Sequence, residues 1–384
     1  MRVKIGFMLD AYKPVINGIT NFVAQYRRAL EAAGHETTVF TWAAPGYTDD
    51  EPRVVRSPAL LALGRTGYAA SLRCSDEAVA TLQSMDLVHV QHPFVSGPLA
   101  LRYAGPRAIP VVYTNHTRYD LYARPYARLL SGSVRTYLRA FLPWFCERCD
   151  LVVTPAPGLA AALRAMGVRA PLTVIGNGID LTRFDGRAGA LERAAFGLAA
   201  GDRVLIYTGR LGPEKNLGFL LRAFAAAAGV EPRLRLLLLG DGPEESALRA
   251  LARGLGITDR VCFAGAVPYE KVPDYLALAD AWTSASVTEV HPLSALEAVA
   301  AGLPVAGLRA AGMLDVVAHG ENGLLAGESE AEFVAVLLRL ARDEALRARL
   351  SAGAWRRRAE FDITTTTARY VAEYERLVAG RRRA

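Results

Sequence analysis

The sequence is poor in cysteine and contains no long uninterrupted apolar run. Its four cysteines are scattered along 384 residues without the spacing of a disulfide framework: Cys74, Cys146, Cys149 and Cys262. This usage favours a reducing compartment. No segment reaches the eighteen or more apolar residues of a membrane span, and the first apolar run, residues 3–9, is too short for a signal peptide. We expect a cytoplasmic protein whose contact with any membrane is peripheral.

The usual signals of a metal or a dinucleotide cofactor are also missing. Cys146 and Cys149 have the spacing of a redox motif, but they lie in an apolar helical run without a second pair, so two partly buried thiols are the better interpretation. Asn17 and Gly18 lack the full glycine-rich fingerprint of a nicotinamide-binding loop. No metal is predicted, because three histidines of the first half show no fixed ligand spacing: His89, His92 and His116.

Length and element order predict two domains. A chain of 384 residues exceeds one ordinary core, and 52% hydrophobic residues against 22% charged residues predict that most of it folds. Short apolar strands alternate with amphipathic helices in both halves, which is typical of parallel sheets with right-handed crossovers. We therefore predict an α/β fold of two Rossmann-like domains whose parallel sheets face each other across a cleft. The predicted strands of the first half are 3–9, 37–42, 87–91, 110–114 and 151–154, and those of the second half are 203–208, 234–239, 261–264, 281–284, 304–307 and 323–325.

The most informative segment runs from Thr288 to Glu297, across the junction of a loop and a helix. It places two carboxylates, Glu289 and Glu297, eight positions apart. Unpaired backbone N–H groups at the start of the helix, near Ser294, favour an anion such as a diphosphate. Glu297 lies near one turn further in, where it is better suited to accept the protons of hydroxyl groups. A ligand that is part phosphate and part polyol, such as a nucleotide sugar, fits this combination.

A second group of charges follows the predicted strand at 203–208. Arg210 and Lys215 lie in a glycine-proline loop that leads into a helix. Transfer of a sugar releases a nucleoside diphosphate with growing negative charge, and preorganised positive groups are the expected main source of rate. In the first half, Asn17 and Gly18 open a helix where the backbone can approach a phosphate closely. Plain surface charges and a structural turn are the alternative interpretations.

Five segments, in the same order along the chain, resemble the retaining glycosyltransferases of the GT-B architecture, family 4 in the sequence classification. They are Gly6–Ile19, Gly34–Thr41, Ile175–Asp180, Tyr207–Asn216 and Thr288–Glu297. The resemblance implies a hexosyltransferase with an acceptor domain at 1–180 and a nucleotide-sugar donor domain at 181–365. It also implies that a C-terminal helix, 366–384, crosses back to the first domain. The nucleotide sugar is then a co-substrate, and no cofactor is expected.

The same resemblance assigns roles within the donor domain. Arg210 and Lys215 are expected to hold the donor diphosphate, Glu289 to contact hydroxyls of the sugar, and Glu297 to bind the ribose. The remaining predicted donor contacts lie between the two glutamates: His291, Pro292, Leu293 and Ser294. Many relatives have glycine at the position of the proline, so one backbone N–H is absent here.

In the first domain, His116 is implied to lie near the transferring bond, where it orients a hydroxyl. The resemblance further implies that the leaving phosphate takes the acceptor's proton on the same face, so that no carboxylate nucleophile and no divalent metal are required. The predicted catalytic residues are His116, Arg210, Lys215 and Glu289, and the predicted donor contacts of the first domain are Asn17 and Gly18.

Residues 90–94 and 113–120 look most like bacterial enzymes that glycosylate diacylglycerol. The stretch 118–148 interleaves arginines with large apolar residues at helical spacing, and a basic amphipathic helix suits an anionic lipid surface. A helix that packs on the sheet with its arginines in water explains the pattern equally well. The predicted acceptor or membrane residues are His92, Arg118, Tyr119, Arg135 and Arg139.

The sequence thus predicts transfer of a hexose from a nucleotide sugar, with UDP-glucose favoured, to a lipid such as diacylglycerol at the inner face of the cell membrane. Three alternatives remain open: a GDP-mannose-type enzyme with a soluble acceptor, a sugar-nucleotide epimerase, and a catalytically inactive binding module. Nucleic acid is a poor partner, because no recognised binding module accompanies the net charge of +7.

Overall fold

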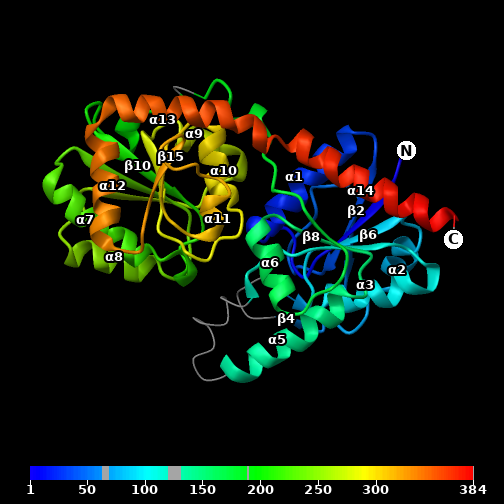
Figure 1. Ribbon diagram of the computed structural model, residues 1–384. Coiled ribbons are helices and arrows are strands. Elements are labelled where there is room, and N and C mark those ends of the chain that lie inside the picture. Colours follow the sequence, from blue (N-terminus) through cyan, green and yellow to red (C-terminus); the bar gives the residue numbers. More distant parts are fainter. Residues whose placement is uncertain (63–68, 120–130, 188–189, 384) are drawn as a thin grey trace. The chain divides into compact units, whose positions relative to one another are not determined.

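The computed structural model describes residues 1–62, 69–119, 131–187 and 190–383 (Figure 1). The chain forms two compact units. The first consists of Met1–Gly178 together with Ile363–Ala384, and the second of Ile179–Asp362. The chain therefore leaves the first unit once and returns to it with its last helix.

The first unit is built on a seven-stranded parallel sheet. Its strand order is β3-β2-β1-β6-β7-β8-β9. The bounds are β1 (Lys4–Met8), β2 (Glu36–Trp42), β3 (Val54–Ser57), β6 (Leu87–Val90), β7 (Val111–Thr114), β8 (Leu151–Thr154) and β9 (Leu172–Val174). The central strands are buried along almost their whole length, as expected for parallel strands that are covered on both faces. A separate antiparallel pair consists of β4 (Leu61–Ala62) and β5 (Ala69–Ala70).

The helices of this unit are α1 (Gly18–Ala32), α2 (Asp76–Leu82), α3 (Ser96–Ala104), α5 (Ser131–Cys146), α6 (Pro157–Ala165) and α14 (Ile363–Arg383). Helix α1 begins at Gly18 because Asn17 caps it. The Asn17 side chain accepts the N–H groups of Ile19 and Thr20, each at 2.9 Å. In return the Thr20 hydroxyl accepts the N–H of Asn17 at 2.9 Å, which completes a reciprocal cap.

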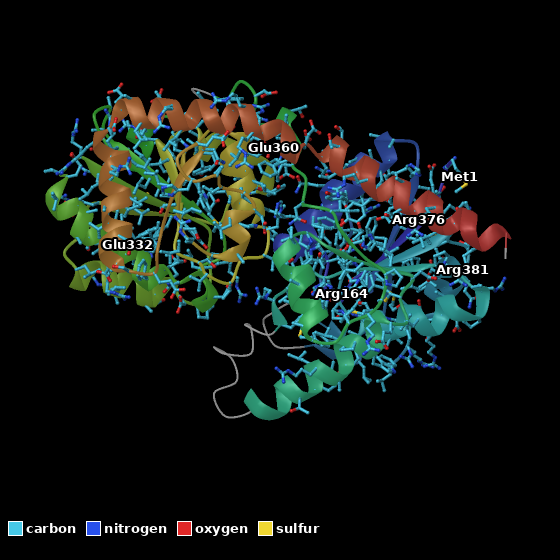
Figure 2. The ribbon with its side chains drawn as sticks, viewed as in Figure 1. Met1, Arg164, Glu332, Glu360, Arg376 and Arg381 are labelled. Carbon is cyan, nitrogen blue, oxygen red and sulfur yellow. The ribbon has the colours of Figure 1, made fainter. Side chains whose placement is uncertain are left out.

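Helix α14 lies alongside α1 and fastens the end of the chain to the first unit (Figure 1). The Tyr374 hydroxyl is hydrogen-bonded to Nδ1 of His89 in the sheet at 2.7 Å. Arg381, which Figure 2 labels near the end of the helix, pairs with Asp150 at 2.6 Å. A buried tyrosine and a surface ion pair therefore anchor the helix at separate points.

The second unit is built on a six-stranded parallel sheet in the order β12-β11-β10-β13-β14-β15. Its strands are β10 (Arg203–Thr208), β11 (Leu234–Leu239), β12 (Val261–Gly265), β13 (Ala281–Ser284), β14 (Val305–Leu308) and β15 (Gly323–Ala326). Its helices are α7 (Leu217–Val230), α8 (Glu245–Gly254), α9 (Val272–Leu276), α10 (Leu293–Ala300), α11 (Ala311–Leu314), α12 (Glu330–Arg342) and α13 (Glu344–Arg357). Short 3₁₀ turns include Leu181–Phe184, Tyr269–Lys271 and Arg358–Phe361.

The core of the second unit follows from helical spacing. Helix α7 buries Leu217, Leu220, Leu221 and Phe224 on one face, three and four residues apart. Each such side chain contributes about 1.5–3 kcal/mol when it is fully buried. This face packs against the strands and α12, and it fixes the loop that precedes α7.

The prediction of an α/β fold with two parallel sheets is confirmed. Strands β8, β10, β11 and β13 have the expected bounds. Four of the described strands were not predicted: β3 and β9, which are short edge strands, and β4 and β5, which have two residues each, and each of the four has a neighbour on one side only. Within the described ranges, no helix combines the length and the apolar character needed to cross a membrane.

Candidate active site

The second unit brings Lys215 and Glu289 together at the carboxyl ends of two neighbouring strands, β10 and β13. The Lys215 ammonium lies 2.6 Å from Oε1 of Glu289, and both side chains are largely buried. Burial alone would lower the pKa of Lys215, but the Glu289 carboxylate outweighs this effect and holds the pKa above its usual value. Lys215 therefore stays charged at the carboxyl ends of the strands, where ligands of parallel α/β sheets bind.

The loop that carries Lys215 is braced by the turn after β11. Leu211 donates its N–H to the Asp241 carbonyl at 2.7 Å, and Gly209 donates to Leu239 at 2.9 Å. Gly240 has a φ of +135°, and a Cβ there would lie 2.0 Å from the carbonyl oxygen of Gly209. Glycine is required at this turn because the two backbones approach so closely. The turn therefore positions the candidate phosphate loop.

Arg210 lies in the same loop but points differently. It is exposed, and its carbonyl oxygen accepts the Tyr207 hydroxyl at 3.0 Å. The loop thus presents one cation to solvent and turns the other toward Glu289. The pairing of Arg210 with a diphosphate stays a prediction.

The start of α10 carries the predicted backbone donors. Pro292 is the N-cap residue and offers no side-chain cap, and the N–H of Ala295 makes the first bond of the helix, to the Pro292 carbonyl at 3.1 Å. The N–H groups of Leu293 and Ser294 precede this bond and have no intrahelical acceptor. Just before them, burial lowers the pKa of His291 to about 4, so its ring is neutral at pH 7. The arrangement suits an anion.

Glu297 lies on α10 and is 5% exposed. Burial raises the pKa of its carboxyl to about 7, while the Tyr269 hydroxyl and the charge of Arg183 oppose that rise. Tyr269 and Arg183 were not predicted as site residues. They lie far from Glu297 in sequence, in segments without a motif, so no local pattern singles them out.

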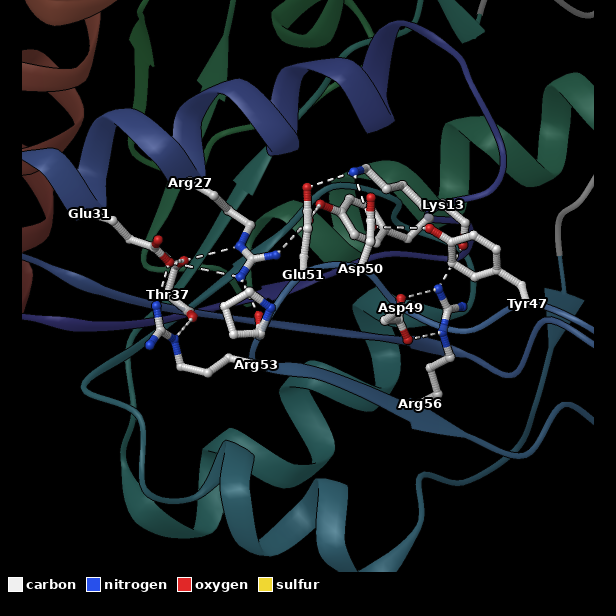
Figure 3. A network of polar contacts seen from close by, with 12 residues as sticks. Lys13, Arg27, Glu31, Thr37, Tyr47, Asp49, Asp50, Glu51, Arg53 and Arg56 are labelled. Carbon is white, nitrogen blue, oxygen red and sulfur yellow. Dashed lines mark hydrogen bonds and ion pairs between the residues drawn. The ribbon is translucent and has the colours of Figure 1, made fainter. Parts of the chain in front are cut away.

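In the first unit, Figure 3 shows how the loop between β1 and α1 is fastened to the segment before β3. Glu51 accepts the Tyr12 hydroxyl at 2.6 Å and pairs with Lys13 at 2.7 Å. It also pairs with Arg27 of α1 at 2.9 Å. Arg56 donates to the carbonyl of Lys13 at 2.6 Å. The loop that leads to the predicted phosphate contacts Asn17 and Gly18 is therefore held near its midpoint.

The predicted histidines lie at the ends of the adjacent strands β6 and β7. Nε2 of His116 is hydrogen-bonded to Oε1 of Gln91 at 2.7 Å, and Nδ1 of His92 accepts the N–H of Asp10 at 3.1 Å. Burial lowers the pKa of both rings. The Asp10 carboxylate in turn accepts the hydroxyl and the N–H of Ser96, at the start of α3. The two rings are therefore neutral and held in fixed orientations.

His89 is part of the structural core. Its Nε2 is hydrogen-bonded to the Thr114 hydroxyl at 2.7 Å, and its Nδ1 to Tyr374 at 2.7 Å. Burial lowers the pKa of its ring to about 3. The two thiols, Cys146 and Cys149, are buried as well, and burial raises their pKa values.

The predicted acceptor helix α5 has one buried and one exposed side. Leu142 and Phe145 are buried, whereas Tyr137 and Trp144 are 52% and 42% exposed. Arg139 is exposed, and the side chain of Arg135 lies outside what the structure describes. Arg118 and Tyr119, the last described residues before position 120, are both half-buried. The centroid of the Tyr119 ring lies 5.2 Å from that of Phe94.

Comparison with known proteins places both units in one family. The family model of group 1 glycosyl transferases matches residues 189–357, and the model of glycosyltransferase family 4 matches residues 16–183. An alpha-monoglucosyldiacylglycerol synthase of Streptococcus pneumoniae is 30% identical over 314 residues, which cover 79% of this chain and 70% of that protein. A D-inositol 3-phosphate glycosyltransferase of Frankia alni is 30% identical over 386 residues, which cover 91% of this chain and 92% of that protein.

Among solved structures, sucrose-phosphate synthase from Thermosynechococcus elongatus matches with a TM-score of 0.80 and 22% identity. The match covers 99% of this chain and 100% of that one, and it supports the fold alone. Both family models, together with relatives that align over most of their length, agree with the resemblance of the sequence motifs. The chain therefore belongs to the family 4 glycosyltransferases of GT-B fold, and it is a hexosyltransferase that transfers a sugar from a nucleotide sugar.

Proposed function

We propose that the protein is a retaining glucosyltransferase that moves glucose from UDP-glucose to a lipid acceptor such as diacylglycerol. The observation that carries the proposal is the Lys215–Glu289 pair at the strand ends of the second unit. A fixed cation suits a leaving diphosphate, and an adjacent carboxylate suits the hydroxyls of a sugar. The choice of glucose and diacylglycerol is supported by the name of the relative from Streptococcus pneumoniae.

In this proposal each site residue has a separate task. Lys215 and Arg210 stabilise the charge that develops on the leaving diphosphate, and the N–H groups of Leu293 and Ser294 bind its oxygens. Glu289 accepts hydrogen bonds from hydroxyl groups of the sugar. The leaving phosphate takes the proton of the acceptor, so that retention requires neither a carboxylate nucleophile nor a divalent metal.

The other predicted contacts complete the proposal. Glu297 binds the ribose, and His291 and Pro292 shape the start of α10 beside it. For the first unit we assign donor contacts to Asn17, Gly18 and His116, and acceptor contacts to His92, Arg118 and Tyr119. The neutral state of His116 suits a ring that accepts or donates one hydrogen bond without adding charge.

Helix α5 supports a peripheral membrane role at the inner face of the cell membrane. The exposed residues of the helix include the aromatic Tyr137 and Trp144 on one face and Arg139 on another, and Arg148 lies over the Trp144 ring at 4.6 Å. Aromatic rings suit the interfacial region of a bilayer, and arginines are attracted by anionic lipids. The side chain of Arg135 is assigned to the same surface as a prediction.

The test is turnover with UDP- and GDP-linked sugars, offered with and without diacylglycerol in anionic vesicles. The proposal expects release of UDP from UDP-glucose that depends on the lipid and yields a new glycolipid with retained configuration. Charge reversal, Arg139→Glu, is expected to reduce binding to anionic vesicles, whereas Arg249→Glu on α8 serves as a matched control in the second unit. Release of UDP that does not depend on the lipid would contradict the proposal of a lipid acceptor.

A second candidate, a glycosyltransferase with a soluble acceptor, is favoured by the relative from Frankia alni, which is named for D-inositol 3-phosphate and aligns over 92% of its own length. This candidate shares the donor residues and predicts turnover with a soluble polyol phosphate in the absence of vesicles. Comparing the two acceptors in one assay separates the candidates directly.

A further inference from the structure

The two residues that flank Lys215 in the chain are both anchored to the segment that leads to Glu289. On one side, the carbonyl oxygen of Glu214 accepts the hydroxyl groups of Ser286 and Thr288, each at 3.2 Å. A carbonyl oxygen has two lone pairs, so one acceptor can bind both hydroxyls. The loop after β10 is therefore joined to the loop after β13 immediately beside the lysine.

On the other side, the side chain of Asn216 does not make the contact that its position suggests. Asn216 is the N-cap residue of α7, where an asparagine side chain ordinarily accepts N–H groups of the first helical turn. Here it makes no such cap, and Nδ2 instead donates to the carbonyl oxygen of Ala285, directly after β13, at 3.2 Å. The backbone of Asn216 has a φ of +54°, a left-handed conformation in which asparagine is enriched. The side chain therefore joins the two loops at a second point.

These hydrogen bonds are shielded from water and determine where Lys215 begins. Ser286 is fully buried, and Thr288 and Asn216 are half-buried. A hydrogen bond in such surroundings is electrostatically stronger than one in water. A lysine side chain has a flexible four-carbon stem, so the position of its ammonium depends on how firmly its backbone is held. With both neighbours fixed, the ammonium of Lys215 lies 2.6 Å from Oε1 of Glu289.

We propose that Ser286, Thr288 and Asn216 are positioning residues that hold the Lys215 ammonium where negative charge develops on the leaving diphosphate. The inference rests on the proposed role of Lys215 in sugar transfer. A fixed charge stabilises a transition state because it needs no reorganisation at the moment of reaction. The three residues act through the backbone on either side of the lysine. Their loss is therefore expected to lower kcat more than it weakens binding of the donor.

The test compares kcat with UDP-glucose and diacylglycerol vesicles against the Kd of UDP-glucose measured without acceptor. Ser286→Ala combined with Thr288→Val removes both hydroxyls and is expected to lower kcat on the order of tenfold. The Kd is expected to change less than about threefold in the same variant. Ser286→Ala combined with Thr288→Ser returns one hydroxyl and is expected to recover most of the lost kcat.

Thr283→Val is the matched control for the lost hydroxyls. Thr283 lies on β13 and is fully buried, and its hydroxyl has no hydrogen-bond partner among the described residues. The same chemical change in the same strand is therefore expected to leave kcat as in the wild type. A loss of kcat in Thr283→Val equal to that of the double variant would contradict the inference.

Asn216→Gly tests the second anchor independently, even if the double variant folds poorly. Glycine adopts a φ of +54° without strain, so the substitution removes the amide and keeps the backbone conformation. It is expected to lower kcat about fivefold, again with a smaller change in the Kd of UDP-glucose. Wild-type kcat in both Asn216→Gly and the double variant overturns the inference.

Repeating the double substitution in a Lys215→Met background separates this inference from the function on which it rests. If the two hydroxyls act through Lys215, their loss is expected to lower kcat by less than about twofold once the ammonium is gone. If the loss is as large as in the wild-type background, the hydroxyls act elsewhere and the inference fails, although the role of Lys215 stands. If Lys215→Met itself keeps near-normal kcat, the proposed role of the lysine fails and the inference fails with it.

Discussion

Lysine is rare in this chain, since arginine supplies all but four of its 45 basic residues. A lysine at position 215 is therefore informative. Its compact ammonium reaches a single carboxylate oxygen of Glu289 at 2.6 Å. The planar guanidinium of an arginine suits a bidentate partner, and its length and shape differ from those of the lysine ammonium. We infer that the site requires a point charge at this place.

Replacing Lys215 with Met is expected to lower kcat with UDP-glucose on the order of 100-fold, about 3 kcal/mol of lost transition-state stabilisation. Lys215→Arg is expected to recover a minor part of that loss. Steady-state kinetics with Lys4→Met, an exposed lysine of the first unit, as control measures the effect. A Lys215→Met enzyme with near-normal kcat would contradict the assignment.

Glu297 also has a consequence for stability. Its pKa is raised from 4.5 to about 7 in the folded protein, so folding favours the protonated form. The stability that the group contributes is present below pH 4.5 and is lost as the pH rises through 7. A glutamine at this position does not titrate, so the free energy of unfolding of Glu297→Gln is not expected to fall in this way. Between pH 5 and pH 8 the variant is therefore expected to gain up to about 3 kcal/mol of stability relative to the wild type. Thermal unfolding of both proteins at the two pH values checks this, and parallel pH curves would contradict it.

At the scale of single residues, site residues that lie within motifs can be predicted from the sequence. Residues whose contacts join segments without a motif cannot. Lys215 and Glu289 lie in separate segments that each carry a recognisable pattern, and the structure brings them together. Arg183 and Tyr269 are 86 positions apart and lie in short turns. Their contact depends on how the two 3₁₀ turns Leu181–Phe184 and Tyr269–Lys271 pack against each other, which no local spacing encodes.

At the scale of elements, the loop that carries Glu289 is fixed by the short helix α11. A Cβ added to Gly312 of α11 would lie 2.3 Å from the carbonyl oxygen of Glu289. Because this neighbour is backbone, the loop must shift to make room. Element packing therefore sets the position of a site carboxylate.

Gly312→Ala is expected to displace the Glu289 loop, to raise the KM for the donor at least several-fold and to destabilise the second unit by about 1–3 kcal/mol. Gly254→Ala is the matched control, since a Cβ at that position meets nothing within 4 Å. Kinetics and thermal unfolding of the two variants measure the difference. Equal behaviour of both would show that the loop tolerates the displacement.

The loop between β1 and α1 depends on Glu51 in the same way. Glu51→Gln removes the charge that Lys13 and Arg27 share and is expected to destabilise the first unit by about 2 kcal/mol. Glu36→Gln breaks an exposed pair with Arg2 and is expected to cost less than about 1 kcal/mol. Chemical denaturation of the two variants tests the ranking, and a reversed order would contradict the role of Glu51.

The elements that the sequence missed are those with the least signal. β9 has three residues, β3 has four, and β4 and β5 have two each, and each of these strands pairs along one side only. Such edge strands lack the long apolar run that marks a central parallel strand. The central strand β8, which is fully buried, was predicted with its correct bounds.

At the scale of the whole molecule, the chain passes from the first unit to the second after Gly178 and returns to the first at Ile363. The two connecting segments contact each other in both units. In the second unit, Ile179 donates its N–H to the Phe361 carbonyl at 2.7 Å. In the first unit, a Cβ on Gly178 would lie 2.7 Å from the Cα of Ile363. A segment-by-segment interpretation of the sequence cannot anticipate this pairing, because the partners lie more than 180 positions apart.

This connection makes the first unit depend on the end of the chain. Helix α14 supplies Tyr370 and Tyr374, both almost fully buried, and the Tyr374 hydroxyl completes the hydrogen bonds of His89. Removing residues 363–384 would expose the apolar face of α1 and leave a buried histidine without one of its partners. The truncated chain is expected to lose the cooperative unfolding of the first unit while the second unit keeps its own transition. Calorimetry of this truncation, with removal of residues 382–384 as the control, checks the expectation, and an unchanged first-unit transition would mean that the seven-stranded sheet holds its fold without α14.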